Sequence, residues 1–149
     1  MTLVERLTLE NQILRRDGMA QFQVYGSPTC GYYLWGEHGT NAGNSYTLWS
    51  PLPAGFPHAC PPLYIYAPNP LRAYAYGRTI NSYGLSHAMH TLNNGPNNEV
   101  QICHWRSDRW HSGLTLNKVM LKAMLWLEAF EQHLSSGRDI DEFVRTMVS

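Results

Sequence analysis

The sequence has no long apolar run, no paired-cysteine motif and no excess of charge of either sign. No stretch of the 149 residues approaches the ~18 apolar residues that span a bilayer, which argues against a membrane protein. Eleven basic residues balance eleven acidic ones, which argues against a nucleic-acid binder, since such proteins normally carry a basic face. There are no internal repeats and no low-complexity tracts. These absences leave one domain over residues 1–149, long enough to bury a core of its own.

Cysteine is scarce, and its spacing excludes a disulfide scaffold. The three cysteines, Cys30, Cys60 and Cys103, lie far apart and form no CxxC pair. An odd number of cysteines fits a reducing compartment. Residues 1–6 carry charges where a secretory signal has its apolar core. We therefore expect a soluble, cytoplasmic protein.

Hydrophobic periodicity predicts a helix followed by a strand meander. Residues 2–17 place apolar side chains at helical spacing, and a following Asp-Gly pair ends the helix. Four strands are predicted at residues 21–25, 32–35, 45–49 and 63–66, with a hairpin loop at 36–44. The proline-rich segment 51–62 lacks the backbone donors that a strand needs, so we expect an ordered extended connector. Residues 67–101 show no regular element, and a loop of this length is usually functional.

A second, longer helix follows this loop. Thr115 is the predicted N-cap, and residues 135–137 end the helix. Its apolar stripe consists of Leu116, Val119, Met120, Ala123, Leu127, Phe130 and Leu134. Lys118 and Lys122 are expected on the solvated face, and residues 139–148 are expected to form a short terminal helix. The predicted class is α+β, with a four-stranded antiparallel meander flanked by the first helix and the long helix.

Cys103 stands out among the polar residues of the chain. It follows the long loop and is flanked by polar and aromatic residues, and a tryptophan-marked turn at Trp110 leads from it into the long helix. Taken alone, Cys103 is equally well explained as a small buried side chain. The surrounding pattern favours a nucleophile held on a rigid loop.

Three segments in order resemble the ubiquitin-conjugating enzyme family. They are Phe-Pro-His-Ala-Cys-Pro-Pro-Leu-Tyr-Ile at 56–65, the Ile-Cys pair at 102–103, and Trp-His-Ser-Gly-Leu-Thr-Leu-Asn-Lys-Val at 110–119. The resemblance covers nearly the whole chain. It implies the ubiquitin-conjugating fold and an acyltransferase. In such an enzyme Cys103 carries the C-terminus of a partner protein as a thioester and passes it to an amine.

One motif of that family is not intact. The family carries His-Pro-Asn shortly before the cysteine, whereas residues 90–97 read His-Thr-Leu-Asn-Asn-Gly-Pro-Asn. The group that stabilises the oxyanion is therefore open among Asn93, Asn94, Asn97 and His90. We take His90 and Asn94 as the candidates. The choice matters because one amide donor on an oxyanion is worth roughly 10²–10³ in rate.

Residues after the cysteine also depart from the eukaryotic pattern. His104 and His111 are similar to those of divergent bacterial members encoded in antiphage operons, including CBASS (cyclic-oligonucleotide-based antiphage signalling). This resemblance implies as partner a CBASS nucleotidyltransferase (CD-NTase), which is a cyclic-oligonucleotide synthase, or a ubiquitin-like protein. The partner would bind through its C-terminus, with an activating enzyme as a further partner. No nucleic acid and no membrane is expected among the partners.

The remaining candidates follow from the chemistry of acyl transfer. His104 and His111 are near enough in sequence to lower the pKa of the Cys103 thiol, and Asp108 is a candidate acidic neighbour of the acceptor amine.

Three alternatives stay open beside this interpretation. The first is a cysteine hydrolase or deconjugating protease that uses Cys103 or Cys30, and the second is a non-catalytic binding module of the same fold. The third is a zinc site that combines His87 and His90 with Cys103 and His104, but the spacing is not that of paired ligands. We predict no metal and no cofactor.

Overall fold

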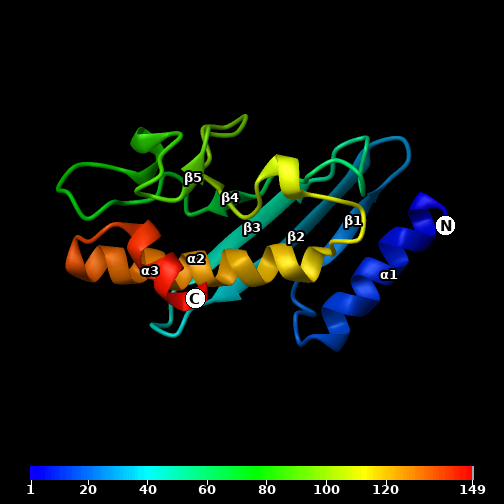
Figure 1. The fold of residues 1–149 in the computed structure, drawn as a ribbon, viewed down its shortest axis with the longest axis horizontal. Coiled ribbons are helices and arrows are strands. Elements are labelled where there is room, and N and C mark those ends of the chain that lie inside the picture. The colour runs from blue at the N-terminus through cyan, green and yellow to red at the C-terminus, as the bar shows by residue number, and fades with distance from the viewer. Residues whose placement is uncertain (149) are drawn as a thin grey trace.

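The chain forms an antiparallel sheet with its helices gathered on one face (Figure 1). The computed structural model describes residues 1–148, with the side chains of residues 1–146. The strands are β1 (Gln23–Ser27), β2 (Gly31–Gly39), β3 (Ser45–Pro51), β4 (Tyr64–Ala67), β5 (Thr91–Leu92) and β6 (Gln101–Ile102). The helices are α1 (Leu3–Arg16), α2 (Leu116–Ser136) and α3 (Ile140–Val148), with short 3₁₀ turns η1 (Ile80–Tyr83) and η2 (Ser107–Arg109). The predicted α+β class is confirmed.

The sheet has six strands in the order β1-β2-β3-β4-β6-β5, so the predicted count of four is wrong. The two extra strands are two residues long and lie in the segment for which no regular element was predicted. Two residues cannot display the period-2 alternation on which strand prediction rests. The β5–β6 hairpin joins the sheet through a pairing of Gln101 with Tyr64. No local sequence pattern predicts this pairing.

The long hairpin between β2 and β3 also differs from the prediction. Strand β2 continues to Gly39, so the turn covers only residues 40–44 instead of 36–44. Gly36 lies inside the strand, and Phe22 passes so close to it that a side chain would not fit. A Cβ at position 36 would lie 2.3 Å from Cδ1 of Phe22. This glycine therefore marks a close approach of two chain segments and not a turn.

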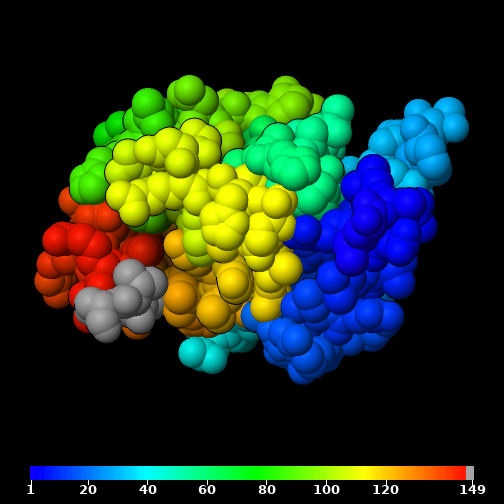
Figure 2. All heavy atoms as spheres, turned by 45° about the vertical axis from the view of Figure 1, so that its right-hand side comes forward, coloured from blue at the N-terminus to red at the C-terminus, as the bar shows by residue number. Residues whose placement is uncertain are grey.

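Side chains of the sheet alternate between a buried face and an open one. Leu34, Leu48 and Ile65 point towards the helices and are 0–1% exposed. They pack against the stripe of α2, including Met120, Leu127 and Phe130. Figure 2 shows the segment after Cys103, coloured yellow, lying between the green loops and the orange turns of α2. The core thus lies between the sheet and α2, and the loop that carries Cys103 lies at its edge.

The start of α2 is fixed from α1 rather than by its own N-cap. Thr115 is at the predicted N-cap position, but its side chain makes no capping bond and instead pairs with Asn117. Glu10 of α1, which is fully buried, accepts from the Leu116 N–H at 2.8 Å. Arg6 binds the other oxygen of Glu10 at 2.8 Å and donates to the carbonyls of Ser112 and Leu114. A buried ion pair therefore joins α1 to the loop that leads from Cys103 into α2.

Candidate active site

Cys103 lines a cleft where side chains from distant parts of the chain meet. The cleft has a volume of about 220 Å³ and lies between the backbone after β6, one stripe of α2, and α3. Its lining includes His90, Cys103, His104, Lys122, Trp126 and Arg145. The candidate nucleophile therefore shares one space with two histidines and a lysine.

The backbone of Cys103 is held by the residue opposite it at the base of the β5–β6 hairpin. The Cys103 N–H donates to the carbonyl of His90 at 3.1 Å. His90 adopts a left-handed φ of 56°, a conformation that costs a non-glycine residue about 1–2 kcal/mol. The thiol is half-buried. Burial raises its pKa, and nearby Lys122 partly opposes this shift. At neutral pH the thiol therefore needs a base that removes its proton.

A carboxylate from α3 orients such a base. Oδ1 of Asp141, a residue only 5% exposed, lies 3.2 Å from Nδ1 of His90. Because a carboxylate only accepts hydrogen bonds, Nδ1 is the donor, and Nε2 of His90 is left free to accept a proton. The Asp141 N–H donates to the carbonyl of Ala88 at 2.9 Å, which fixes the start of α3 beside His90. A thiol, an imidazole and a carboxylate that binds this imidazole therefore lie in one region, and these are the groups that nucleophilic catalysis uses.

The second oxygen of Asp141 is also occupied. His87 Nε2 and Arg145 Nε lie 3.3 and 3.0 Å from Oδ2. Both partners are largely exposed, whereas the carboxylate is buried. A buried carboxylate is stable only when its lone pairs are satisfied, so these contacts hold Asp141 in place.

His104 differs from His90 in environment and in charge. Its Nε2–H donates to the carbonyl of Pro61 at 2.7 Å, and its buried Nδ1 has no partner among the described residues. Burial lowers the pKa of His104 to about 4, against the opposing effect of the Pro61 hydrogen bond. His104 is therefore a neutral imidazole at physiological pH. It leaves one unpaired acceptor at the wall of the cleft.

This environment predicts a pH dependence of folding. The folded pKa of about 4 lies below the ordinary 6.5, so the unfolded chain binds the proton more readily. The stabilisation is complete above pH ~6.5 and is lost as the pH falls towards ~4, with a total of about 3 kcal/mol. We expect the difference in unfolding free energy between the native chain and His104→Gln to shrink over that window in urea titrations. A difference independent of pH would contradict the assigned neutral state.

The proline-rich connector anchors the loop on the other side of Cys103. It forms no strand after β3, as predicted, and its carbonyls accept from His104 and from Trp110 Nε1, the latter at 2.9 Å from Pro57. Proline lacks the N–H but keeps its carbonyl, so the segment can accept hydrogen bonds without belonging to the sheet.

Three of the residues predicted as catalytic do not reach the cleft. Asn94 lies in the loop of the β5–β6 hairpin, where its amide binds the carbonyl of Asn81 at 2.8 Å and Asn98 Oδ1 at 2.7 Å. It is four residues further along the hairpin than His90, or roughly 13 Å at ~3.3 Å per residue. Asp108 is exposed and pairs with Arg106. His111 is exposed, and its Nδ1 accepts from the Gly113 N–H.

Lys122 does line the cleft, contrary to the prediction of a solvated face. Its Nζ lies 3.6 Å from the centroid of the Trp105 ring, and burial lowers its pKa. Lys122, Leu125 and Trp126 share one stripe of α2 at i, i+3 and i+4 spacing. Lys122 follows Val119 by three residues and precedes Trp126 by four, and this helical spacing from two buried residues could have predicted its position. No sequence signal could have predicted the role of Asp141, because its contact with His90 spans 51 residues.

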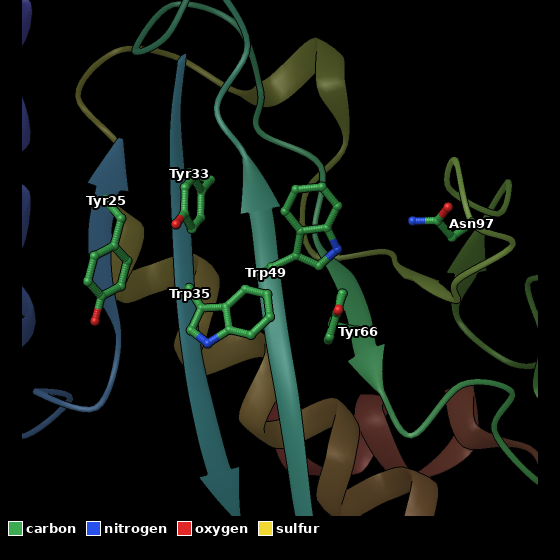
Figure 3. Close-up of a pocket in the computed structure, with 6 residues that line it drawn as sticks. All are labelled: Tyr25, Tyr33, Trp35, Trp49, Tyr66 and Asn97. Carbon is green, nitrogen blue, oxygen red and sulfur yellow. The ribbon is translucent and has the colours of Figure 1, made fainter. Parts of the chain in front are cut away.

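A larger hollow lies on the open face of the sheet (Figure 3). It has a volume of about 550 Å³ and is lined by Tyr25, Tyr33, Trp35, Trp49, Tyr66 and Asn97. These rings come from β1 to β4 and stand side by side, with Trp35 and Tyr66 4.7 Å apart. The lining holds no cysteine, histidine or charged group, so the smaller cleft around Cys103 is the candidate for chemistry.

Comparisons with known proteins identify no relative of this chain. A scan against models of protein families, a search of curated proteins and a search of solved structures each found no match. Within residues 1–148, no three His, Cys, Asp or Glu side chains are grouped to hold a metal ion. No helix in that range is both long and apolar enough to cross a bilayer.

Proposed function

We propose that the protein is a cysteine-dependent acyltransferase of the ubiquitin-conjugating type. Cys103 accepts the C-terminus of a partner protein as a thioester and passes it to an amine. The observation that carries the proposal is the meeting of Cys103, the Asp141-oriented His90 and Lys122 in one cleft. A thiol beside an oriented base is the arrangement that nucleophilic catalysis requires.

The acylation step follows from the two side chains. Nε2 of His90 takes the proton of the Cys103 thiol, and the thiolate attacks the carbonyl carbon of the donor. The donor reaches the cleft as an activated acyl group, such as the thioester of an activating enzyme. The S–C bond to Cys103 forms, the bond from the acyl carbon to the donor's thiol breaks, and His90 returns the proton to the departing thiolate. Asp141 stabilises the imidazolium that exists between the two transfers. An incoming amine then repeats the sequence, and Cys103 is released as the leaving group.

The order of elements supports the same proposal. A helix, an antiparallel meander, a proline-rich connector, a cysteine on a loop and a long helix follow one another as in the family that the sequence resembles. On that resemblance, we propose a cytoplasmic role in antiphage defence. The acyl donor would be a CBASS nucleotidyltransferase or a ubiquitin-like protein. An adjacent gene for either donor would support the assignment.

Hydrolysis is the second candidate, and a specific contact favours it. The hydrogen bond between His90 and Asp141 supplies the partner that a cysteine hydrolase needs. The two candidates share the acyl-enzyme and differ only in the acceptor, which is water in one case and an amine in the other.

One experiment tests both candidates. The protein is incubated with the aryl thioester of N-acetylglycine, with and without free lysine, and acylated residues are mapped by mass spectrometry. We expect a hydroxylamine-sensitive adduct on Cys103, and more acyl-lysine than free acid when lysine is present. Asp141→Asn should slow acylation by about 10²-fold or more, because a neutral amide no longer stabilises the His90 imidazolium by its charge and can turn its NH₂ group towards Nδ1. Free acid as the main product would favour the hydrolase. Absence of the Cys103 adduct would contradict both.

A further inference from the structure

The packing of α2 brings Lys122 into the cleft that holds Cys103. Both side chains line this 220 Å³ cleft, and Trp126, one turn after Lys122, lines it too. Trp126 is 1% exposed, and its Nε1–H donates to the carbonyl of Met89 at 3.1 Å. This bond fixes α2 against the residue before His90. The lysine is therefore held at a rigid wall of the cleft rather than on a mobile surface.

The amine of Lys122 lies over an aromatic ring. Its Nζ is 3.6 Å from the centroid of the Trp105 ring, and among the described residues no carboxylate forms an ion pair with it. Trp105 in turn meets Trp110 edge to face at 6.3 Å. The ring holds the amine in position, while half-burial favours its neutral, nucleophilic form. Lys118, one turn earlier on the same helix, is exposed.

A second feature of the cleft is the histidine next to Cys103 in sequence. His104 is only 6% exposed and lines the cleft, and its buried Nδ1 has no partner among the described residues. A buried acceptor without a partner costs about 1–3 kcal/mol. An N–H donor brought within reach of this nitrogen, such as the amide of an acylated lysine, would remove that cost.

We propose that Lys122 is an internal acyl acceptor, so that the protein acylates itself from the Cys103 thioester. This inference rests on the proposed function, because it requires Cys103 to carry an acyl group. The acyl-lysine would remove the positive charge beside Cys103 and occupy the cleft. Self-acylation would therefore close the site to a further donor.

The transfer balances without any additional reactant. The lone pair of the neutral Nζ attacks the thioester carbonyl, the N–C bond forms and the S–C bond breaks. Cys103 leaves as thiolate, and the proton lost by nitrogen passes to it, directly or through His90. The products are an amide at Lys122 and a free thiol at Cys103.

The test uses the aryl thioester of N-acetylglycine and the intact chain. We expect hydroxylamine-resistant acylation at Lys122, exceeding that at Lys118 by at least ~10²-fold, because attack within the cleft has a high effective molarity. Lys122→Arg keeps the charge over Trp105 and removes the nucleophile, so the Cys103 thioester should live longer. Lys118→Arg, the matched control, should leave both signals unchanged. Cys103→Ala should lose the Lys122 amide.

The outcomes separate the two proposals. A Cys103 thioester without a Lys122 amide overturns self-acylation and leaves the proposed function standing. Equal acylation of Lys122 in Cys103→Ala also overturns self-acylation, because the donor would then react directly with the lysine. A chain with no Cys103 thioester overturns the proposed function and self-acylation with it.

Discussion

Replacing Cys103 with alanine is expected to lower acyl-enzyme formation by roughly 10⁴–10⁶-fold, which in practice abolishes it. The proposed mechanism has one nucleophile, and the other groups of the cleft act through it. Once the sulfur is gone, His90 has no thiol proton to take and Asp141 has no imidazolium to stabilise, so their own substitutions should add little to the alanine variant. The measurement is the hydroxylamine-sensitive adduct formed with the aryl thioester of N-acetylglycine, followed by intact mass.

The other two cysteines provide matched controls. Cys30 is exposed and Cys60 is half-buried, and neither lies in the cleft. Burial raises the pKa of the Cys60 thiol, and proximity to Cys103 adds to the shift. Cys30→Ala and Cys60→Ala should retain the adduct. If the adduct persists in Cys103→Ala and disappears in one of these two variants, the nucleophile is misassigned.

Glu10→Ala is expected to lower the free energy of unfolding by about 3–5 kcal/mol, a large effect for one residue of a first helix. The change leaves Arg6 with its charge unpaired and the first N–H of α2 without an acceptor. Both consequences lower the free energy of unfolding, and both arise where the loop that carries Cys103 enters α2. Urea denaturation followed by circular dichroism measures the loss.

The control for Glu10 is an ion pair with the same spacing on an exposed surface. Arg138 and Glu142 are also i and i+4, but Arg138 is largely exposed and Glu142 is partly exposed. Glu142→Ala should cost about 0.3–0.5 kcal/mol. Glu10→Gln should lie between these values, since an amide oxygen still caps α2 while the charge is lost. A cost below ~1 kcal/mol for Glu10→Ala would show that the buried pair does not hold the two helices together.

Periodic segments were predictable because burial on one face repeats along them. The apolar stripe from Leu116 gave α2 its extent, and Gly137 ends the helix in the left-handed conformation expected of a C-terminal glycine. The meander was predictable for the same reason, whereas the connector was predicted to form no strand because its prolines lack backbone donors. The β5–β6 hairpin was not, since its strands are too short to carry a pattern.

The candidate site likewise contains residues that the sequence could predict and residues that it could not. Cys103 was identified from its neighbours in sequence, because the tryptophan turn and helix start beside it are local features. Asn94, Asp108 and His111 were chosen for the same nearness, yet the hairpin register and the exposed loop take them away from the cleft. Nearness along the chain does not decide which way a side chain points.

The sequence by itself determined the α+β class, the main helices and the choice of Cys103, since each depends on periodicity or on residues a few positions apart. Only the tertiary structure decided that Asp141 binds His90, that Lys122 lines the same cleft as Cys103, and that Glu10 caps α2. Two of these are hydrogen bonds between residues 51 and 106 positions apart. Such contacts depend on how helices pack against the sheet, and no local preference of the chain encodes them.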